Sequence, residues 1–303
     1  MRVERANAKI NLYLDVVSRR EDGYHNLISL MQTVSLCDVV TVEYRPSLHT
    51  SIYLQASGND EMPLDCRNLA WRAAEVFLSA TGRSGEVRIT IEKHIPMAAG
   101  LAGGSADAAA VLRGLNHLCG SPFSRRRLCE LGESLGADVP FCVVGGSAMV
   151  TGIGECLEEI APLPQCHMVV ACMGEGVSTP RAYGKLDEKY GFFSEAPERE
   201  PRVKEIEKRL KAKKLFEASE FFYNVFEEVV PMEQPWVDRL KNCMIQNDAV
   251  CAMMSGSGPS VFGIFETAEA AGDAYSALRE MGVTAFVCHP TPAYVRDENE
   301  KTH

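Results

Sequence analysis

A glycine-rich loop between a strand and a helix constrains this chain more than any other segment. Residues 87–95 alternate apolar and polar side chains, which is the period of a half-buried strand. After the loop, apolar residues recur at helical spacing. Between the two elements, glycines let a ligand approach the backbone. Such a loop aims backbone N–H groups and the positive end of a helix dipole at one point, which predicts an anion site, most often for phosphate. The glycines are Gly100, Gly103 and Gly104, and the apolar helix positions are Ala108, Val111, Leu112 and Leu115.

The loop differs from the two commonest nucleotide-binding motifs. A Walker A sequence is absent, since Gly184-Lys185 is preceded by Thr179 where the first glycine should stand. The dinucleotide fingerprint Gly-x-Gly-x-x-Gly is absent too. On spacing alone, a purely structural turn between a strand and a packed helix stays an open alternative.

Three motifs in a fixed order resemble those of the kinase superfamily named after galactokinase and the homoserine, mevalonate and phosphomevalonate kinases (GHMP kinases). The glycine loop continues as Gly-Gly-Ser-Ala-Asp-Ala-Ala at 103–109, which is similar to the long second motif of the 4-diphosphocytidyl-2-C-methyl-D-erythritol kinase family. Ala-Lys-Ile-Asn-Leu at 8–12 and Asp-Gly-Tyr-His at 22–25 resemble that family's N-terminal signature. Met-Ser-Gly-Ser-Gly-Pro-Ser-Val at 254–261 resembles the third superfamily motif. The resemblance therefore covers nearly the whole chain.

The resemblance implies a fold, an activity and two cofactors. It implies an α+β, two-domain GHMP-kinase fold with the active site in the cleft between the domains. It also implies an ATP- and Mg²⁺-dependent kinase that phosphorylates the 2-hydroxyl of 4-diphosphocytidyl-2-C-methyl-D-erythritol, in the non-mevalonate route to isoprenoid precursors. A superfamily kinase with another acceptor is one alternative. A non-catalytic nucleotide-binding protein on the same scaffold is the other, although such a protein needs no general base.

Asp138 is the candidate general base. It stands between small and apolar neighbours in Gly-Ala-Asp-Val-Pro-Phe at 136–141, where a turn aspartate that caps backbone N–H groups is the alternative. The segment matches the one that carries the catalytic aspartate in the resembled family. The resemblance likewise pairs Lys9 with this aspartate, whereas a lone lysine among apolar residues usually extends its stem along them. Such a cation would favour the charged carboxylate. Asn11, two residues along the strand, shares the face of Lys9 and is a candidate to hydrogen-bond the substrate.

Tyr24 and His25 are the candidate acceptor-binding residues. By residue type they fit an ordinary surface loop. In the resembled family the same unit holds the cytosine base by stacking and by hydrogen bonds, and stacking contributes about 1–3 kcal/mol per base. Thr179 and Tyr183 lie in a segment, expected to be a loop, where the family places an aromatic residue against the base.

The nucleotide is expected to contact residues in and around the glycine loop. Ser105 can contact a phosphate oxygen or Mg²⁺ through its hydroxyl, or simply cap the helix. Asn68 matches a family asparagine that contacts adenine, with a helix N-cap as the alternative. Lys93 and His94 lead into the loop and can meet adenine or phosphate. The predicted ATP-binding residues are Asn68, Lys93, Pro96, Met97, Ala98, Ala99, Gly100, Leu101, Ala102, Gly103, Gly104, Ser105 and Ala106.

The glycine motifs depart from the family pattern at two positions. Ala102 stands where the family most often has glycine, and the sequence predicts that it avoids a positive φ. Ala106 stands where the family often has serine, which removes one possible phosphate or metal ligand. Neither change touches Lys9 or Asp138. In the third motif, Gly256 and Gly258 are expected to let the loop of the second domain close on phosphate or substrate.

The pattern of elements predicts two domains. Ser124 reads as the N-cap of a helix that buries leucines at positions 128, 131 and 135. Prolines at 162 and 164, followed by an apolar run, place a boundary near residue 163. We expect an ATP-binding domain at 1–163, a C-terminal domain at 164–295 and a disordered tail at 296–303. Expected strands lie at 10–17 and 39–44, expected helices at 68–79 and 216–230, and a solvated helix face or loop at 197–214.

Composition excludes several classes of protein. The chain has 303 residues, of which 46% are hydrophobic, and a formal net charge of −10, which argues against a nucleic-acid binder. No run of 18 apolar residues and no apolar N-terminal segment occur, so we expect neither a membrane helix nor a signal peptide. Eleven cysteines without a Cys-x-x-Cys pair predict reduced thiols and no zinc site. We therefore expect a cytoplasmic enzyme with a small-molecule substrate and no obligate protein partner.

Overall fold

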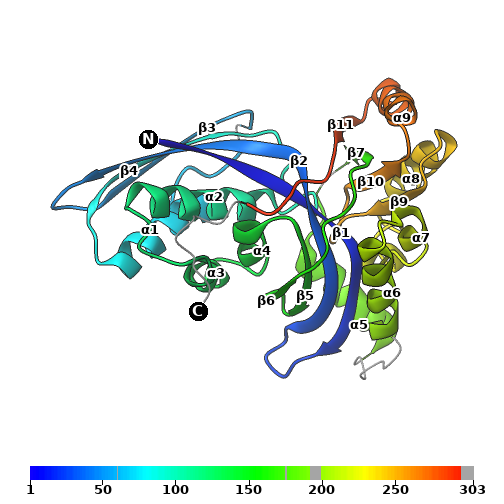
Figure 1. The fold of residues 1–303 in the computed structure, drawn as a ribbon, viewed down its shortest axis with the longest axis horizontal. Coiled ribbons are helices and arrows are strands. Elements are labelled where there is room, and N and C mark those ends of the chain that lie inside the picture. Colours follow the sequence, from blue (N-terminus) through cyan, green and yellow to red (C-terminus); the bar gives the residue numbers. More distant parts are fainter. Residues whose placement is uncertain (60, 175, 192–198, 295–303) are drawn as a thin grey trace.

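The structure is a computed structural model that describes residues 1–59, 61–174, 176–191 and 199–294. Two sheets with flanking helices form the two halves of the molecule (Figure 1). This mixture of helices and largely antiparallel sheets is the predicted α+β class. The predicted tail at 296–303 lies outside the described residues.

A seven-stranded sheet organises the N-terminal half. Its strands follow the order β3-β4-β2-β1-β8, and β5 pairs with β2 and β6. The first two strands form a long antiparallel hairpin whose register shifts on both sides of Lys9–Asn11. Such bulges re-aim side chains, so they set the direction of the residues between them. The strands are β1 (Arg2–Arg19), β2 (His25–Pro46), β3 (Ser51–Ser57), β4 (Gly85–Glu92), β5 (Ser147–Gly152), β6 (Cys156–Glu159) and β8 (Tyr223–Asn224).

Four helices accompany this sheet: α1 (Leu69–Thr81), α2 (Gly103–Leu118), α3 (Arg125–Glu133) and α4 (Val139–Val144). The predicted N-cap Ser124 is confirmed, since its side chain accepts a hydrogen bond from the first turn of α3. Asn68 takes the N-cap position of α1 in the same way, which is the alternative to its adenine contact. The apolar face of α2 is fully buried against the sheet, as its spacing predicts. The glycine loop therefore connects β4 to a helix that the core holds firmly.

A four-stranded antiparallel sheet of order β11-β7-β10-β9 organises the C-terminal half. Its strands are β7 (His167–Cys172), β9 (Cys251–Met254), β10 (Val261–Phe265) and β11 (Thr284–Cys288). The helices of this half are α5 (Thr179–Tyr190), α6 (Arg199–Lys211), α7 (Leu215–Ser219), the 3₁₀ helix η1 (Val225–Glu228), α8 (Trp236–Gln246) and α9 (Ala268–Glu280).

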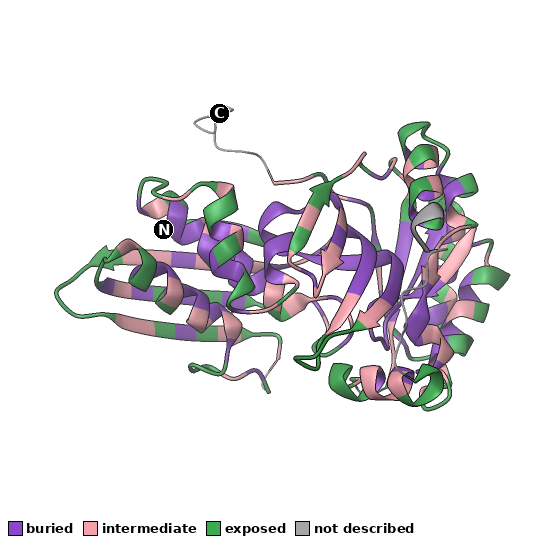
Figure 2. Cartoon of the chain, turned by 90° about the horizontal axis from the view of Figure 1, so that it is seen from below, coloured by how far each residue is buried: buried purple, intermediate pink, exposed green. Residues whose placement is uncertain are grey.

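Strand β1 joins the two halves. From Ala6 to Val16 all of its residues are buried, and Figure 2 shows the buried strands running through the middle of the molecule. Ala6 belongs to the core under α1 and α2, Ile10 to a central core shared with the second sheet, and Leu14 to the core around α8 and α9. A strand buried on both faces has an almost continuous apolar sequence. The side chain of Lys9 projects from within this strand.

Two sequence predictions in the C-terminal half are corrected. The expected helix at 216–230 is instead α7, the short strand β8 and η1, because Tyr223 and Asn224 pair with β1. Within this segment Val225 and Phe226 are buried, whereas Phe222 is only half-buried. The stretch at 197–214, expected to be a solvated helix face or loop, is mostly helix α6. This helix buries Val203, Ile206 and Leu210 and is therefore not simply a solvated face.

The end of the described chain returns to the N-terminal half. After β11 the backbone forms bridges at Val34–Pro290 and Gly145–Ala293 (Figure 1). We call residues 289–294 the C-terminal strap. It lies against β2 and the end of α4, so it connects the second sheet to the N-terminal half.

Candidate active site

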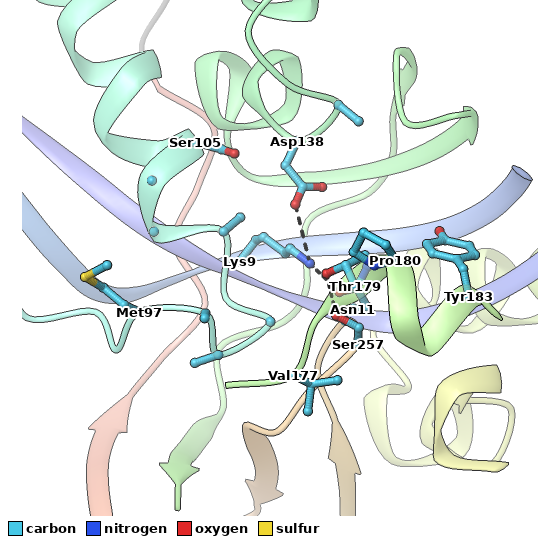
Figure 3. A pocket seen from close by; sticks show the side chains of 18 of the residues that line it. Lys9, Asn11, Met97, Ser105, Asp138, Val177, Thr179, Pro180, Tyr183 and Ser257 are labelled. Atoms are coloured by element: carbon cyan, nitrogen blue, oxygen red, sulfur yellow. Dashed lines mark hydrogen bonds and ion pairs between the residues drawn. The ribbon is translucent and has the colours of Figure 1, made fainter. Parts of the chain in front are cut away.

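One cavity of about 980 Å³ brings together most of the predicted site residues. Its walls come from β1, the β1–β2 turn, the glycine loop, the start of α4, the start of α5 and the third motif. Figure 3 shows the side chains converging on Lys9 and Asp138 from both halves of the molecule. The predicted residues that line the cavity are Lys9, Asn11, Tyr24, His25, Asn68, Lys93, Pro96, Met97, Ala98, Ala99, Gly100, Ala102, Gly103, Gly104, Ser105, Asp138, Thr179, Tyr183 and Gly256.

Lys9 and Asp138 form an ion pair at the centre of the cavity. The Lys9 Nζ lies 3.9 Å from Asp138 Oδ2 and donates a hydrogen bond of 2.7 Å to Asn11 Oδ1. The Lys9 side chain is 5% exposed and that of Asp138 is 34% exposed, so the carboxylate faces the open side. Asp138 precedes α4, yet its side chain makes no capping hydrogen bond in the described chain. The turn-cap alternative is therefore wrong, and the carboxylate is available to a ligand.

The two glycine motifs pack backbone against backbone beside Lys9. Ser255 Oγ donates to the Gly100 carbonyl at 3.0 Å, and the Ser260 amide donates to the Ala99 carbonyl at 3.2 Å. A side chain at Gly100 would collide with the Ser255 carbonyl, and one at Gly256 would lie 2.9 Å from the Gly100 carbonyl. Only glycine permits this approach. The glycine loop is thus held from the second domain as well as from its own.

The start of α2 differs from the sequence prediction at two positions. Ala102 has φ +56°, so the expectation that it avoids a positive φ is wrong. Its left-handed backbone turns the chain into α2, where it takes the N-cap position without a side-chain hydrogen bond. Ser105 lies inside the first turn, lines the cavity and leaves the N-cap role to Ala102. The cavity therefore meets the free N–H end of α2, where the helix dipole favours anions.

Lys93 is locked in a buried cluster beneath the loop. Its Nζ donates to Asp38 Oδ2 and, at 2.7 Å, to Asp107 Oδ2. Burial disfavours the ammonium, but the Asp107 and Asp38 carboxylates outweigh burial and raise the pKa of Lys93. Burial, opposed by the Lys93 ammonium, raises the pKa of Asp107. His94 is exposed and does not line the cavity formed by the described residues.

The far end of the cavity is aromatic and acidic. The ring of His25 stacks on Tyr183 with centroids 4.7 Å apart, and Nε2 of His25 lies 2.8 Å from Asp187 Oδ1. Asp187 also pairs with Arg19 at 3.2 Å. Tyr24 is 62% exposed at the rim. Burial, with a smaller effect of Asp138, raises the pKa of Tyr183 to about 12, so its phenol stays neutral at physiological pH.

Helix α5 supplies another wall of the cavity. Thr179 and Tyr183 lie at its start, so the segment expected to be a loop is helical from Thr179. Residues four apart share one face of a helix, which places Thr179, Tyr183 and Asp187 in one row. Thr179 Oγ1 lies 2.9 Å from Ser257 Oγ, which ties this helix to the third motif.

Some predicted residues do not line the cavity as the described residues form it. Leu101 and Ala106 are each 1% exposed and pack into the cores, and Gly258 lies behind Met254. Asn68 lines the cavity, but its Oδ1 accepts from the Ala70 amide and its Nδ2 donates to the Pro63 carbonyl.

Residues that sequence reasoning missed include Arg19, Asp38, Asp107, Asp187 and Ser257. Asp107 and Ser257 stand within the quoted motifs, so their position was a usable signal. Arg19, Asp38 and Asp187 carry no such signal in the sequence, because their partners are distant in the chain.

The sequence is similar to known kinases along its whole length. It matches the family described as "GHMP kinases N terminal domain" at residues 68–146 and "GHMP kinases C terminal" at 200–284. It is 42% identical over 292 residues to the 4-diphosphocytidyl-2-C-methyl-D-erythritol kinase of Alkaliphilus metalliredigens, covering 96% of each chain. The chain belongs to this kinase family. The relative from Caldicellulosiruptor bescii is 40% identical over 91% of each chain.

Solved structures agree with this family. A crystal structure of 4-(cytidine 5'-diphospho)-2C-methyl-D-erythritol kinase superposes with a TM-score of 0.77 at 35% identity, covering 95% of this chain and 99% of that one. A homoserine kinase from Cytophaga hutchinsonii superposes with a TM-score of 0.71 at 18% identity, which shows the shared fold alone. The described part of the chain has no helix with the length and apolar character that a bilayer span requires.

Proposed function

We propose that the protein is an ATP-dependent kinase that phosphorylates the 2-hydroxyl of 4-diphosphocytidyl-2-C-methyl-D-erythritol, an early intermediate of the non-mevalonate isoprenoid route. The observation that carries the proposal is the Lys9–Asp138 pair, which lies in one cavity with the glycine loop on one side and the His25–Tyr183 stack on the other. A base, a phosphate cradle and an aromatic pocket are the three parts that this reaction needs.

In the proposed mechanism Asp138 accepts a proton and Lys9 stabilises negative charge. The acceptor hydroxyl gives its proton to Asp138, and its oxygen bonds to the γ-phosphorus of ATP. The bond from that phosphorus to the β,γ-bridging oxygen breaks, and ADP leaves. Lys9 stabilises negative charge on the attacking oxygen, and Asn11 holds the Lys9 ammonium in place at 2.7 Å.

The glycine loop and α2 hold the phosphates. Backbone N–H groups at the start of α2 face the cavity, and the Ser105 hydroxyl lies beside them. Among the described residues no group of three or more metal-ligating side chains occurs, so Mg²⁺ would be bound mainly by phosphate oxygens with Ser105 as a side-chain contact. That set fits a nucleotide-borne Mg²⁺, which would neutralise phosphate charge.

The aromatic end of the cavity receives the cytidine. Tyr24 is exposed at the rim and can cover a base, while His25 and Tyr183 form the inner wall. Figure 3 shows Thr179 between Tyr183 and Lys9, and Gly256 lines the cavity beside Lys9, so both would contact the erythritol. Gly258 packs against the Met254 side chain, so its effect on the acceptor would be exerted through the rest of the third motif.

The remaining assignments follow from this activity. We place the ATP-binding domain at 1–163 and the C-terminal domain at 164–295, with a small molecule as the acceptor. A cytoplasmic location and independence of nucleic acid, membrane and an obligate protein partner belong to the same proposal.

An acceptor panel tests the proposal. ATP consumption is measured with Mg²⁺ and, in separate reactions, diphosphocytidyl-methylerythritol, mevalonate, homoserine or galactose. We expect turnover with the cytidylated acceptor alone. The Asp138→Asn variant should lower kcat by about 10²–10⁴-fold and leave ADP binding unchanged, because it removes the base and keeps the shape.

Three results would contradict the proposal at different points. Turnover with another acceptor would remove the cytidine assignment and keep the Lys9–Asp138 chemistry. Near wild-type activity of Asp138→Asn would remove its role as the base. No ATP consumption with any acceptor, together with normal ADP binding, would favour the non-catalytic alternative.

A further inference from the structure

Asp38 holds the chain where it enters the glycine loop. This aspartate, in β2, is 0% exposed. Its Oδ1 accepts hydrogen bonds from the amides of His94 and Ile95 at 2.6 and 2.8 Å, and its Oδ2 accepts one from Lys93. Three consecutive residues between β4 and the loop are therefore bound to one carboxylate.

Asp107 holds the chain where it leaves the loop. It lies in α2, its side chain is 2% exposed, and its Oδ2 accepts from Lys93 Nζ at 2.7 Å. Its Oδ1 is buried without a hydrogen-bond partner in the described chain. The Lys93 ammonium thus connects the two ends of the loop through two carboxylates. A side chain at Gly103 would lie 3.1 Å from that ammonium, so glycine leaves room for the connection.

Burying two carboxylates and one ammonium costs free energy. Burying charges loses their hydration, and apolar side chains of similar volume often stabilise a fold equally well. The loop itself contains alanines with left-handed backbones at Ala98 (φ +51°) and Ala102 (φ +56°). Strained backbone of this kind persists only where the surroundings hold it in place. The charged cluster provides that support at both ends of the strained segment.

We infer that Asp38, Lys93 and Asp107 form a brace that positions the glycine loop for the phosphates of the nucleotide. They are positioning residues, because they hold the segments that lead into and out of the loop. The inference rests on the function proposed above, which assigns the loop to ATP. The inference predicts an effect on ATP binding and none on acceptor binding. The brace holds the loop, and the hydrogen bonds of its three residues do not involve His25 or Tyr183.

Two substitutions at one position test the brace. Asp107→Leu removes the acceptor for Lys93, whereas Asp107→Asn keeps an oxygen that can accept the same hydrogen bond. We expect Asp107→Leu to raise the dissociation constant of ADP, measured by calorimetry, and the KM for ATP by about tenfold or more. The KM for the cytidylated acceptor should stay within about twofold, and Asp107→Asn should recover most of the ADP affinity.

A stability-matched control separates positioning from general loosening. Leu278→Ala opens a cavity in α9, far from the loop, and should lower the melting temperature without changing ADP affinity. If Asp107→Leu does not fold, Asp38→Asn replaces it, because its oxygen can still accept from the His94 and Ile95 amides while its amide group cannot accept from Lys93.

The inference is overturned if a folded Asp107→Leu or Asp38→Asn variant binds ADP as tightly as the wild type. It is also overturned if Leu278→Ala weakens ADP binding to the same extent. Failure of the wild type to bind ADP at all would instead contradict the proposed function, so the two failures are distinguishable.

Discussion

Backbone conformation at single residues shapes the glycine loop. Ala98 and Ala102 both adopt left-handed φ values, a region that costs an L-residue with a Cβ about 1–2 kcal/mol. At Ala102 the conformation turns the chain into α2, so the turn is required although the residue is poorly suited to it. The nearby contacts from Ser255 and Ser260 offset this cost by holding the loop.

Ala102→Gly should therefore stabilise the protein. Glycine removes the left-handed penalty but adds freedom to the unfolded chain, which leaves a gain of about 0.5–1 kcal/mol in the free energy of unfolding. Urea titration followed by circular dichroism measures it. Ala106→Gly, the same change inside α2, is the control and should lose about 1–2 kcal/mol, because it adds backbone freedom in a helix and also removes a buried methyl group. Equal losses for both variants would show that the φ of Ala102 costs nothing.

At the scale of elements, a short irregular segment supports the third motif. Asn224, 2% exposed, lies in β8 and donates to the carbonyls of Met254 at 2.8 Å and Gly256 at 2.9 Å. Its Oδ1 caps η1 by accepting from the Phe226 amide. One amide side chain thus joins β8, η1 and the loop that lies beside Lys9.

Asn224→Ala should be strongly destabilising. It leaves two buried carbonyls and one amide without their partner, which predicts a loss of about 2–4 kcal/mol in the free energy of unfolding. Chemical denaturation measures the loss. Asn247→Ala removes a single, half-buried hydrogen bond at the end of α8 and should cost about 1 kcal/mol or less. A similar cost for the two variants would argue against the bracing role of Asn224.

At the scale of the whole molecule, the C-terminal strap connects the second sheet to the N-terminal half. The Tyr294 amide donates to the Val144 carbonyl at the end of α4, and its hydroxyl accepts from the Asn7 amide at 3.1 Å. The guanidinium of Arg113 lies 3.7 Å from the Tyr294 ring centroid. The strap therefore contacts β1 two residues before Lys9 and α4 at the opposite end from Asp138.

Tyr294→Phe tests the strap, because it keeps the ring and removes the hydroxyl. We expect a loss of about 1–2 kcal/mol in the free energy of unfolding at neutral pH. Burial raises the pKa of Tyr294, so the wild-type hydroxyl stays protonated in the fold above the pH at which it ionises in the unfolded chain. Its stabilisation is complete below about pH 10 and is lost as pH rises through the folded-state pKa. The difference between wild type and variant should shrink over that range, and a constant difference would contradict this.

Several features followed from the sequence because they depend on neighbouring residues. The strand before the glycine loop, the buried face of α2 and the N-cap Ser124 are short-range patterns, and all are confirmed. The family, and with it the two-domain fold, followed from three ordered motifs. The helix expected at 216–230 failed because pairing of Tyr223 with Tyr13 outweighs local helical spacing.

The assembly of the site was decided by tertiary structure. Lys9 and Asp138 come from different elements, and His25 meets Asp187 across 162 positions of the chain. The Lys93 brace and the packing of Gly100 on Gly256 likewise join segments that are distant in sequence. The sequence by itself determined which residues can do the chemistry, because residue type and local spacing are written in it. Their distances depend on how β1 is buried between the two halves, because packing across the cores sets them.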